Sequence, residues 1–202
     1  MMKHSVILAS ASPRRADLLR QLGLSFDTQP VAIDETPRPG EEPEAYVQRL
    51  AREKALAGYQ QVGQAEALVI GSDTTVVLEH RILGKPVDRE EAKSMLQALS
   101  GRTHQVMTGV ALTTSDGTKV SVSTTDVEFR SLDEREIDAY CDTGEPMDKA
   151  GAYGIQGRGG AFVASIKGSY SAVVGLPLDV TASLLTGAGL PVWHYWTSNN
   201  GE

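Results

Sequence analysis

The sequence lacks the features that mark several large classes of protein. Its 202 residues include a single cysteine, Cys141, which excludes an intramolecular disulfide and is typical of a reducing compartment. No apolar run approaches the roughly 20 residues needed to cross a bilayer, and the N-terminus lacks the apolar block of a secretion signal. With 19 basic and 26 acidic side chains, the net charge is −7, which argues against generic binding to nucleic acid or to an anionic membrane. We therefore expect a cytoplasmic protein that binds neither.

Motifs of several well-known sites are also missing. The sequence has no G-x-x-x-x-G-K-[ST] phosphate loop, no G-x-G-x-x-G after a strand and no G-x-S-x-G elbow. We interpret the histidines as surface or hydrogen-bonded residues, because they are scattered without metal-ligand spacing. They are His4, His80, His104 and His194. Cys141 lies on an apolar helical face, which favours core packing over a role as nucleophile.

The segment from Leu8 to Arg15 combines a buried strand, a turn and a helix start that carries two arginines. Ser12 is a good N-cap and Pro13 suits the first helical position. Arg14 and Arg15 then fall in the first turn, where the helix dipole disfavours each of them by roughly 0.3 to 1 kcal/mol. The alternative interpretation is a pair of solvated arginines. The strand, turn and proline context favours a phosphate site, since free N–H groups, a serine hydroxyl and two guanidinium groups would converge there.

The remaining pattern alternates between helical and strand periodicity. We expect helices over about 13–22, 46–55, 88–99, 131–140 and 178–185, and strands over about 6–9, 26–33, 67–78, 106–112, 120–129, 162–166 and 170–174. This mixture predicts an α/β fold in which helices flank a mixed β-sheet, with a cleft between two lobes. The length suits a single domain over residues 1–202, with a tail from about residue 193.

Acidic residues interrupt or follow two of the predicted strands. An uncompensated buried carboxylate is costly, so Asp73, within the apolar run 67–78, must face a polar cleft, a cation or a hydrogen-bonding partner. Lys54 lies on the apolar stripe of the second helix and fits either a snorkelling lysine or a cleft-facing one. Asp34 and Glu35 follow another strand and could equally form a solvated loop. Carboxylate oxygens suit Mg²⁺ or Mn²⁺, which assist phosphate hydrolysis beside a cationic anchor.

Two further segments carry candidate ligand groups. Lys85, in a Gly-Lys-Pro sequence, could add to the cationic group. The glycine-rich segment 148–157 contains Tyr153 and Gln156, which offer stacking and edge hydrogen bonds to a flat ligand where glycine permits close backbone approach. Most glycine-rich segments are ordinary loops, so this pattern is weak when taken alone.

Seven segments follow one another along nearly the whole chain and together form a specific combination. They are LASASPRR (8–15), IDE (33–35), GSDT (71–74), GKP (84–86), LSGRTHQVMT (99–108), EPMDKAGAYGIQG (145–157) and GSYSAVVGLPL (168–178). The combination closely resembles the Maf family of nucleotide pyrophosphatases. The resemblance implies a fold similar to the inosine triphosphatase type, a homodimer, and a nucleoside triphosphate substrate cleaved between the α and β phosphates with a divalent cation, Mg²⁺ or Mn²⁺.

The resemblance also implies roles for individual residues. Asp73 is the expected general base or metal-linked carboxylate, and Glu35 the expected metal or water ligand. Five residues would hold phosphates: Ser10, Arg14, Arg15, Lys54 and Lys85. GSDT together with AYGIQG is similar to the branch that acts on dTTP and UTP, in which the positions of Arg14, Thr74 and Gln156 are associated with specificity.

Three functions remain in competition at this point. The first is a house-cleaning pyrophosphatase for dTTP, UTP and modified pyrimidine nucleotides. Gln156 suits it, because an amide can donate to a pyrimidine O4 and accept from N3–H. The second is action on a methylated purine nucleotide such as m7GTP, which Thr74 disfavours. The third is a regulator of septum formation that binds a nucleotide without turnover.

Overall fold

The computed structural model describes residues 5–196 and contains a seven-stranded mixed β-sheet. The strands are β1 (Ser5–Leu8), β2 (Asp27–Thr28), β3 (Ala67–Leu78), β4 (Arg81–Leu83), β5 (Thr103–Thr114), β6 (Gly117–Phe129) and β7 (Val163–Lys167). Their order is β2-β1-β3-β5-β6-β7, and β4 pairs with β3 outside this path. β1 is parallel to β2 and β3, whereas β4 is antiparallel to β3 and β7 is antiparallel to β6.

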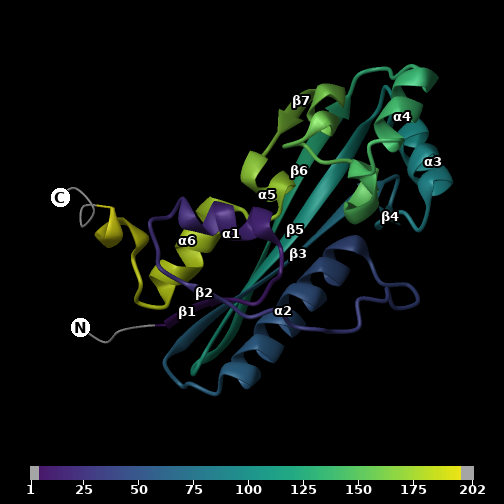
Figure 1. Cartoon of the computed structure of the whole chain (residues 1–202). Helices are drawn as coiled ribbons and strands as arrows, with labels where there is room; N and C mark the ends of the chain where they lie inside the picture. The colour runs from purple at the N-terminus through teal and green to yellow at the C-terminus, as the bar shows by residue number, and fades with distance from the viewer. Residues whose placement is uncertain (1–4, 197–202) are drawn as a thin grey trace. The chain divides into compact units, whose positions relative to one another are not determined.

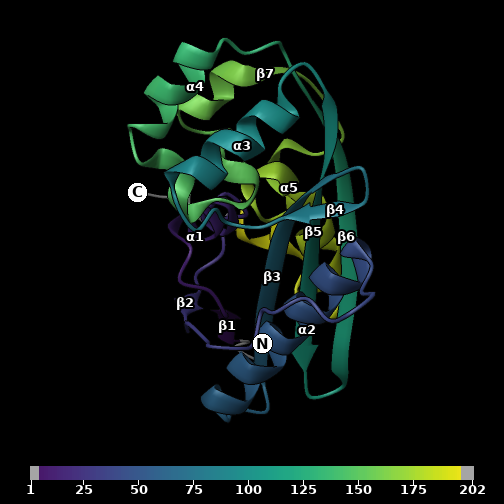
Figure 2. The same ribbon diagram turned by 90° about the vertical axis from the view of Figure 1, so that its right-hand side faces the viewer.

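Helices flank this sheet, as Figures 1 and 2 show. The α-helices are α1 (Pro13–Arg20), α2 (Pro43–Val62), α3 (Arg89–Leu99), α4 (Glu134–Cys141), α5 (Tyr170–Val174) and α6 (Leu178–Gly187). Short 3₁₀ helices are η1 (Glu145–Asp148), η2 (Ala150–Ala152), η3 (Arg158–Phe162) and η4 (Val192–Tyr195). The predicted fold class, a mixed sheet with flanking helices, is confirmed. None of the helices within residues 5–196 is both long and apolar enough to cross a membrane.

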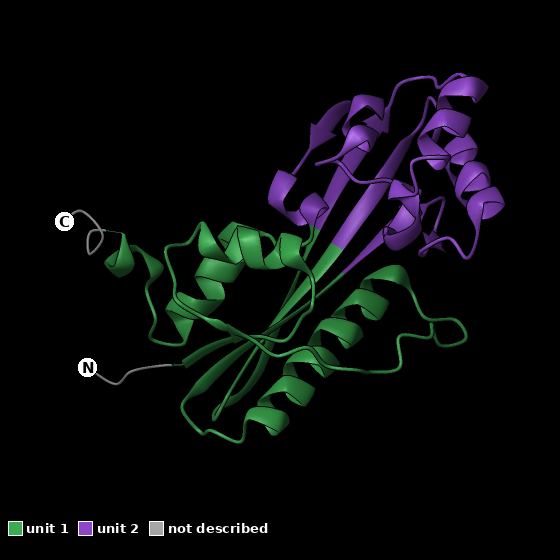
Figure 3. Ribbon diagram, in the orientation of Figure 1, with its two compact units in different colours: residues 1–73, 108–123, 175–202 green, residues 74–107, 124–174 purple. Residues whose placement is uncertain are grey.

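The chain divides into two compact units, which Figure 3 colours separately. Unit 1 takes the described parts of residues 1–73, 108–123 and 175–202, and unit 2 takes residues 74–107 and 124–174. Strands β3, β5 and β6 each contribute residues to both units. Each unit is therefore assembled from segments that are far apart in the sequence.

Two glycines bring α2 close to the strands of unit 1. A Cβ atom at Gly71 in β3 would lie 2.4 Å from the carbonyl oxygen of Ala51, and one at Gly109 in β5 would lie 2.4 Å from that of Val47. Because the neighbouring atoms are helix backbone, which cannot move aside cheaply, only glycine fits at both positions. The apolar face of α2 is thereby packed directly against β3 and β5. In Figures 1 and 2, α1 and α6 lie on the other side of these strands.

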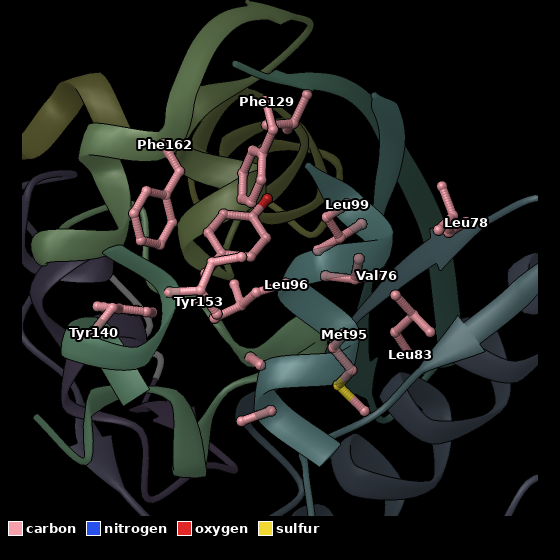
Figure 4. Packing of buried hydrophobic residues seen from close by; sticks show 14 of the residues in the cluster. Val76, Leu78, Leu83, Met95, Leu96, Leu99, Phe129, Tyr140, Tyr153 and Phe162 are labelled. Atoms are coloured by element: carbon pink, nitrogen blue, oxygen red, sulfur yellow. The ribbon is translucent and has the colours of Figure 1, made fainter. Parts of the chain in front are cut away.

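The core of unit 2 is rich in aromatic rings (Figure 4). The ring of Phe129 meets those of Tyr153 and Phe162 edge to face, with centroids 4.7 and 5.9 Å apart. Leu96 and Leu99 of α3 complete this cluster. Cys141 lies in the same cluster and is buried, which supports the interpretation of a packing residue; burial also raises the pKa of its thiol and makes it a poorer nucleophile.

His104 is buried in this aromatic core, where its ring contacts Phe129 and Tyr153 edge to face. Its Nε2 lies 2.8 Å from the hydroxyl oxygen of Tyr153, whereas its buried Nδ1 has no hydrogen-bond partner within residues 5–196. Burial lowers the pKa of His104 to about 4 because the imidazolium would lose its hydration. The expectation of a hydrogen-bonded histidine is thus met at one ring nitrogen only.

Three local predictions need correction. The strand expected over 26–33 is only Asp27–Thr28, because Pro30 has no N–H to extend the ladder. The strand expected over 170–174 is helix α5, and Ser169 Oγ accepts a bond from Ala172 N at its start (3.2 Å). The helix expected from residue 131 begins at Glu134, since Asp133 serves as its N-cap.

The predicted tail from about residue 193 falls partly within the described region. Residues 192–195 form η4, and Trp196 Nε1 donates to the carbonyl oxygen of Leu22 at 3.0 Å. Residues 197–202 lie outside the described residues, as does His4.

Candidate active site

A buried lysine joins two carboxylates in unit 1. Lys54 Nζ lies 2.7 Å from Asp73 Oδ1 and 2.7 Å from Glu35 Oε1. The side chains of Lys54 and Asp73 are each 10% exposed, and that of Glu35 is 51% exposed. The prediction that Asp73 must face a cation or polar partner is confirmed. The snorkelling interpretation of Lys54 is wrong, because its ammonium group is held by two carboxylates and its side chain is 10% exposed; the cleft-facing role stays a prediction.

The fold explains why Lys54 reaches Asp73. Lys54 follows Leu50 and Ala51 on the buried face of α2, and the absence of a side chain at Gly71 allows that face to approach β3. Side chains alternate along a strand, so Asp73 faces the same side as Gly71. The salt bridge is therefore a direct result of helix periodicity, strand periodicity and one glycine.

The carboxyl group of Asp73 has a perturbed proton affinity. Burial raises its pKa, and the nearby charges of Lys54 and Arg15 lower it without cancelling the effect of burial, so the pKa stays above its ordinary value. A carboxylate with a raised pKa accepts a proton from water more readily near neutral pH. The raised pKa of Asp73 is compatible with a role as proton acceptor.

Arg15 is held near these carboxylates by several hydrogen bonds. Its Nε donates to the carbonyl oxygen of Gly175 at 2.9 Å, and its Nη1 lies 3.5 Å from Ser10 Oγ. Ser12 Oγ accepts from the backbone N–H of Arg15 at 3.4 Å, which confirms the predicted N-cap of α1. Burial lowers the pKa of Arg15, while Asp73 opposes that shift. The guanidinium group of Arg15 is thus close enough to Asp73 for their charges to attract each other. The first turn of α1 contains no acidic residue.

Sequence reasoning missed two groups that fix this arrangement. The carbonyl oxygen of Gly175 accepts from Arg15 and also from Ser72 Oγ, which lies 3.0 Å away. The same Ser72 hydroxyl lies 2.9 Å from the carbonyl oxygen of Gly109. A backbone carbonyl leaves no side-chain signal in a sequence, so its role could not have been anticipated. The place of Ser72 among the polar residues that interrupt the apolar strand β3 is a usable signal.

The loop before α2 directs Glu35 toward Lys54. Tyr46 of α2 donates its hydroxyl proton to the carbonyl oxygen of Glu35 at 2.9 Å, and burial together with nearby Asp73 and Glu35 raises the pKa of Tyr46 to about 12. Asp34 accepts instead from the backbone N–H of Thr36 at 2.9 Å, which closes a local turn. Glu35 therefore pairs with Lys54, whereas Asp34 stabilises the loop.

The other predicted residues are distributed between the two units. Arg14 is half-buried beside Arg15 in α1, in unit 1. Thr74 follows Asp73 along β3 and belongs to unit 2, as do the exposed Lys85 and Gln156. A bond from Gly151 N to the carbonyl oxygen of Gly84 (3.1 Å) joins the segments that carry Lys85 and Gln156. The structure thus brings these two segments together within unit 2.

The donor set at Lys54 is compatible with a hard divalent cation. Within residues 5–196 no group of three or more histidine, cysteine, aspartate or glutamate side chains gathers at one point. Mg²⁺ commonly binds through one or two carboxylates and completes its shell with water and substrate phosphates. Glu35 and Asp73 offer such a pair, because one oxygen of each contacts the same ammonium group.

Comparison with known proteins identifies close relatives. A family model described as Maf-like protein matches residues 5–188. A dTTP/UTP pyrophosphatase of Shewanella sp. (strain MR-7) is 56% identical over 192 residues, which cover 92% of this chain and 99% of the relative. One of Hahella chejuensis is 50% identical, over 95% of this chain and 96% of the relative. A solved dITP/XTP pyrophosphatase of Mycobacterium abscessus superposes with a TM-score of 0.42 at 17% identity, covering 69% of this chain and 95% of that one.

Proposed function

Because the chain belongs to the Maf family, we propose that it hydrolyses dTTP, UTP and modified pyrimidine nucleotides to the monophosphate and pyrophosphate, in a house-cleaning role. Relatives that are 50% or more identical over nearly the whole chain carry the name dTTP/UTP pyrophosphatase. The observation that carries the proposal is the buried Asp73 carboxylate, which contacts Lys54 and shares its surroundings with Arg15.

In the proposed reaction, water is the nucleophile and Asp73 is the base. The water oxygen forms a new bond to the α-phosphorus, its proton passes to Asp73, and the bond from the α-phosphorus to the bridging oxygen breaks. Pyrophosphate leaves with the bonding electrons. Arg15 and Lys54 place positive charge where negative charge develops on the phosphate oxygens. Ser10, Arg14 and Lys85 are proposed to bind the same phosphate chain.

A divalent cation, Mg²⁺ or Mn²⁺, completes the proposal. When bound, such an ion neutralises phosphate charge and makes water more acidic. Glu35 and Asp73 are the residues that would hold it. Lys54 keeps these two carboxylates next to each other, since both contact its ammonium group at 2.7 Å.

We propose that the base is recognised by residues other than Lys54, Asp73 and Glu35. Gln156 offers an amide that can donate to O4 and accept from N3–H of thymine or uracil, a pattern that cytosine does not match. Thr74 and Arg14 are proposed to contribute to the same selectivity. Thr74 disfavours the alternative substrate m7GTP, for which a larger amide would be expected at that position.

Three wider expectations stay predictions. We propose that the chain acts as a homodimer, that residues 1–202 form one domain, and that the protein is cytoplasmic. Support for the last comes from the single cysteine, which is typical of a reducing compartment.

Pyrophosphate release from a nucleotide panel tests the proposed function. We expect release from dTTP and UTP with Mg²⁺ or Mn²⁺, and weak release from dCTP, ATP, GTP and m7GTP. Turnover of m7GTP in preference to dTTP would favour the second function. Tight nucleotide binding with no turnover of any member would favour the nucleotide-binding regulator of septum formation.

A further inference from the structure

Gln156 lies in a turn that is closed by its own backbone. Gly157 N donates to the carbonyl oxygen of Gly154 at 3.1 Å, so that Ile155 and Gln156 occupy the two central positions. The side chain of Gln156 is exposed. A short turn at the surface orders its side chains poorly unless other groups hold it.

The carboxylate of Glu145, at the start of η1, holds the chain immediately after this turn. Oε2 accepts from the backbone N–H of Arg158 at 3.1 Å, and Oε1 accepts from that of Gly159 at 3.2 Å. The Glu145 side chain is 15% exposed. Hydrogen bonds to an ionised acceptor are roughly twice as strong as neutral ones. The residues that follow Gln156 are therefore fixed to one anion.

Tyr140 connects the same carboxylate to Gly154, the first residue of the turn. Its hydroxyl donates to Glu145 Oε1 at 3.0 Å and accepts from the backbone N–H of Gly154 at 3.2 Å. The chain is thus tied to Glu145 on both sides of Gln156, directly at Arg158 and Gly159 and through the Tyr140 hydroxyl at Gly154.

The backbone of the turn passes directly over the carboxylate. A Cβ atom at Gly157 would lie 2.3 Å from Glu145 Oε1 and 2.6 Å from Cδ, so a side chain there would push the carboxylate out of its present position. Burial raises the pKa of Glu145, but the bonds from Gly159, Arg158 and Tyr140 outweigh this and hold its pKa below the ordinary value. The carboxylate is ionised at neutral pH, in the state that these donors require.

We propose that Glu145 is a positioning residue for base recognition: it fixes the turn so that the Gln156 amide is placed before the nucleotide binds. The inference rests on the proposed function, in which Gln156 contacts the pyrimidine edge. Glu145 acts through the backbone and not by touching substrate. Fixing the turn in advance removes an ordering cost that would otherwise weaken binding of the correct base.

Glu145→Gln tests this role, because it keeps the shape of the side chain but turns one acceptor into a donor that faces backbone N–H groups. We expect KM for dTTP to rise about 10-fold, kcat to change less than about 2-fold, and the preference for dTTP over dCTP to fall about 10-fold. Inhibition by inorganic tripolyphosphate, which has no base, should not change. In a Gln156→Ala background, Glu145→Gln should add little further effect.

Controls separate this role from general stability. Glu136→Gln removes a comparable carboxylate of unit 2, one that pairs with Arg130 on the surface, and should leave the dTTP to dCTP preference intact. Tyr140→Phe breaks the connection to Gly154 and should shift the preference in the same direction by about 3-fold. If the Glu145→Gln variant does not fold, the base preference of Tyr140→Phe tests the positioning role instead.

The outcomes distinguish this inference from the proposed function. A wild-type chain that releases no pyrophosphate from dTTP or UTP defeats the proposed function. Binding of dTTP and dCTP, measured by calorimetry on the same variants, then decides the role of Glu145 without turnover. An unchanged base preference in Glu145→Gln and Tyr140→Phe, or equal losses with dTTP, dCTP and tripolyphosphate, would overturn the positioning role.

Discussion

Lys54 Nζ and Asp73 Oδ1 lie 2.7 Å apart with both side chains almost fully buried. The pair couples α2 to β3 at the place where the strand changes from apolar to polar. When one member of the pair is removed, a different opposite charge remains near the other. Asp73 loses a neighbouring cation but keeps Arg15 in its field, whereas Lys54 keeps Glu35 as a second contact.

Asp73→Asn should separate catalysis from binding. The amide keeps the size of the side chain and can still accept from Lys54, but it cannot accept a proton from water. We expect kcat for dTTP to fall by about 10²- to 10⁴-fold, while the dissociation constant of dTTP stays within about 3-fold because the phosphate-binding groups remain. Asp17→Asn, which alters an exposed aspartate paired with Arg20, is the matched control. Rates within threefold of wild type would remove Asp73 from the mechanism.

Lys54→Met should destabilise the fold through the carboxylates that it leaves behind. Loss of one partner of a buried pair costs about 3 kcal/mol, because the remaining charge is uncompensated. Urea unfolding at pH 7 measures this loss. In the double variant Lys54→Met, Asp73→Asn the buried charge of Asp73 is absent and only the half-exposed Glu35 has lost its partner, so the loss should be smaller than for Lys54→Met alone. Strictly additive free energies would show that the two side chains do not interact.

His104 should make the protein less stable in mild acid. Its pKa is about 4 in the folded protein and about 6.5 in an unfolded chain. The unfolded state therefore binds more protons between these values, and stability that is complete above pH 6.5 declines as the pH falls toward 4. The loss is on the order of 3 kcal/mol.

The measurement is the free energy of unfolding in urea at several pH values from 7.5 to 4.5. His104→Gln, which cannot titrate, should show a shallower decline over this range than wild type. His80→Asn removes an exposed histidine in the β3–β4 turn, where an αL-tolerant residue is needed because φ is +67°. It should reproduce the wild-type decline. Equal slopes for all three proteins would contradict the role assigned to His104.

The sequence was sufficient for the features that depend on local chemistry. Ser12 and Pro13 predicted the start of α1 correctly, since capping is decided by neighbouring residues. The cost of burying Asp73 predicted that it would meet a cation or polar partner, and Lys54 confirms it. The strand β3 was equally clear, because its valine, isoleucine and threonine residues favour a strand over a helix.

Features that depend on distant residues could not be predicted. The segment at Tyr170 has the β-branched composition of a strand, yet it forms helix α5, and the residue before it is held by the distant Thr125, whose Oγ1 accepts from Ser169 N at 3.0 Å. The carbonyl oxygen of Gly175 has no signature in the sequence, although Arg15 and Ser72 both bind to it. Glu145 is one of many acidic residues until the turn that it holds is seen in three dimensions.

The bond from Arg15 to Gly175 has a consequence for how the protein is made. The two residues are 160 positions apart, so at about 5 to 20 residues per second the ribosome needs roughly 8 to 32 seconds to supply the acceptor after the arginine. Throughout that interval Arg15 lacks the contact that orients it. An abortive translation product that ends before Gly175 therefore carries Arg14 and Arg15 without the hydrogen bond that orients Arg15, and the geometry on which the proposed phosphate site depends is complete only when the last segment of unit 1 has been made.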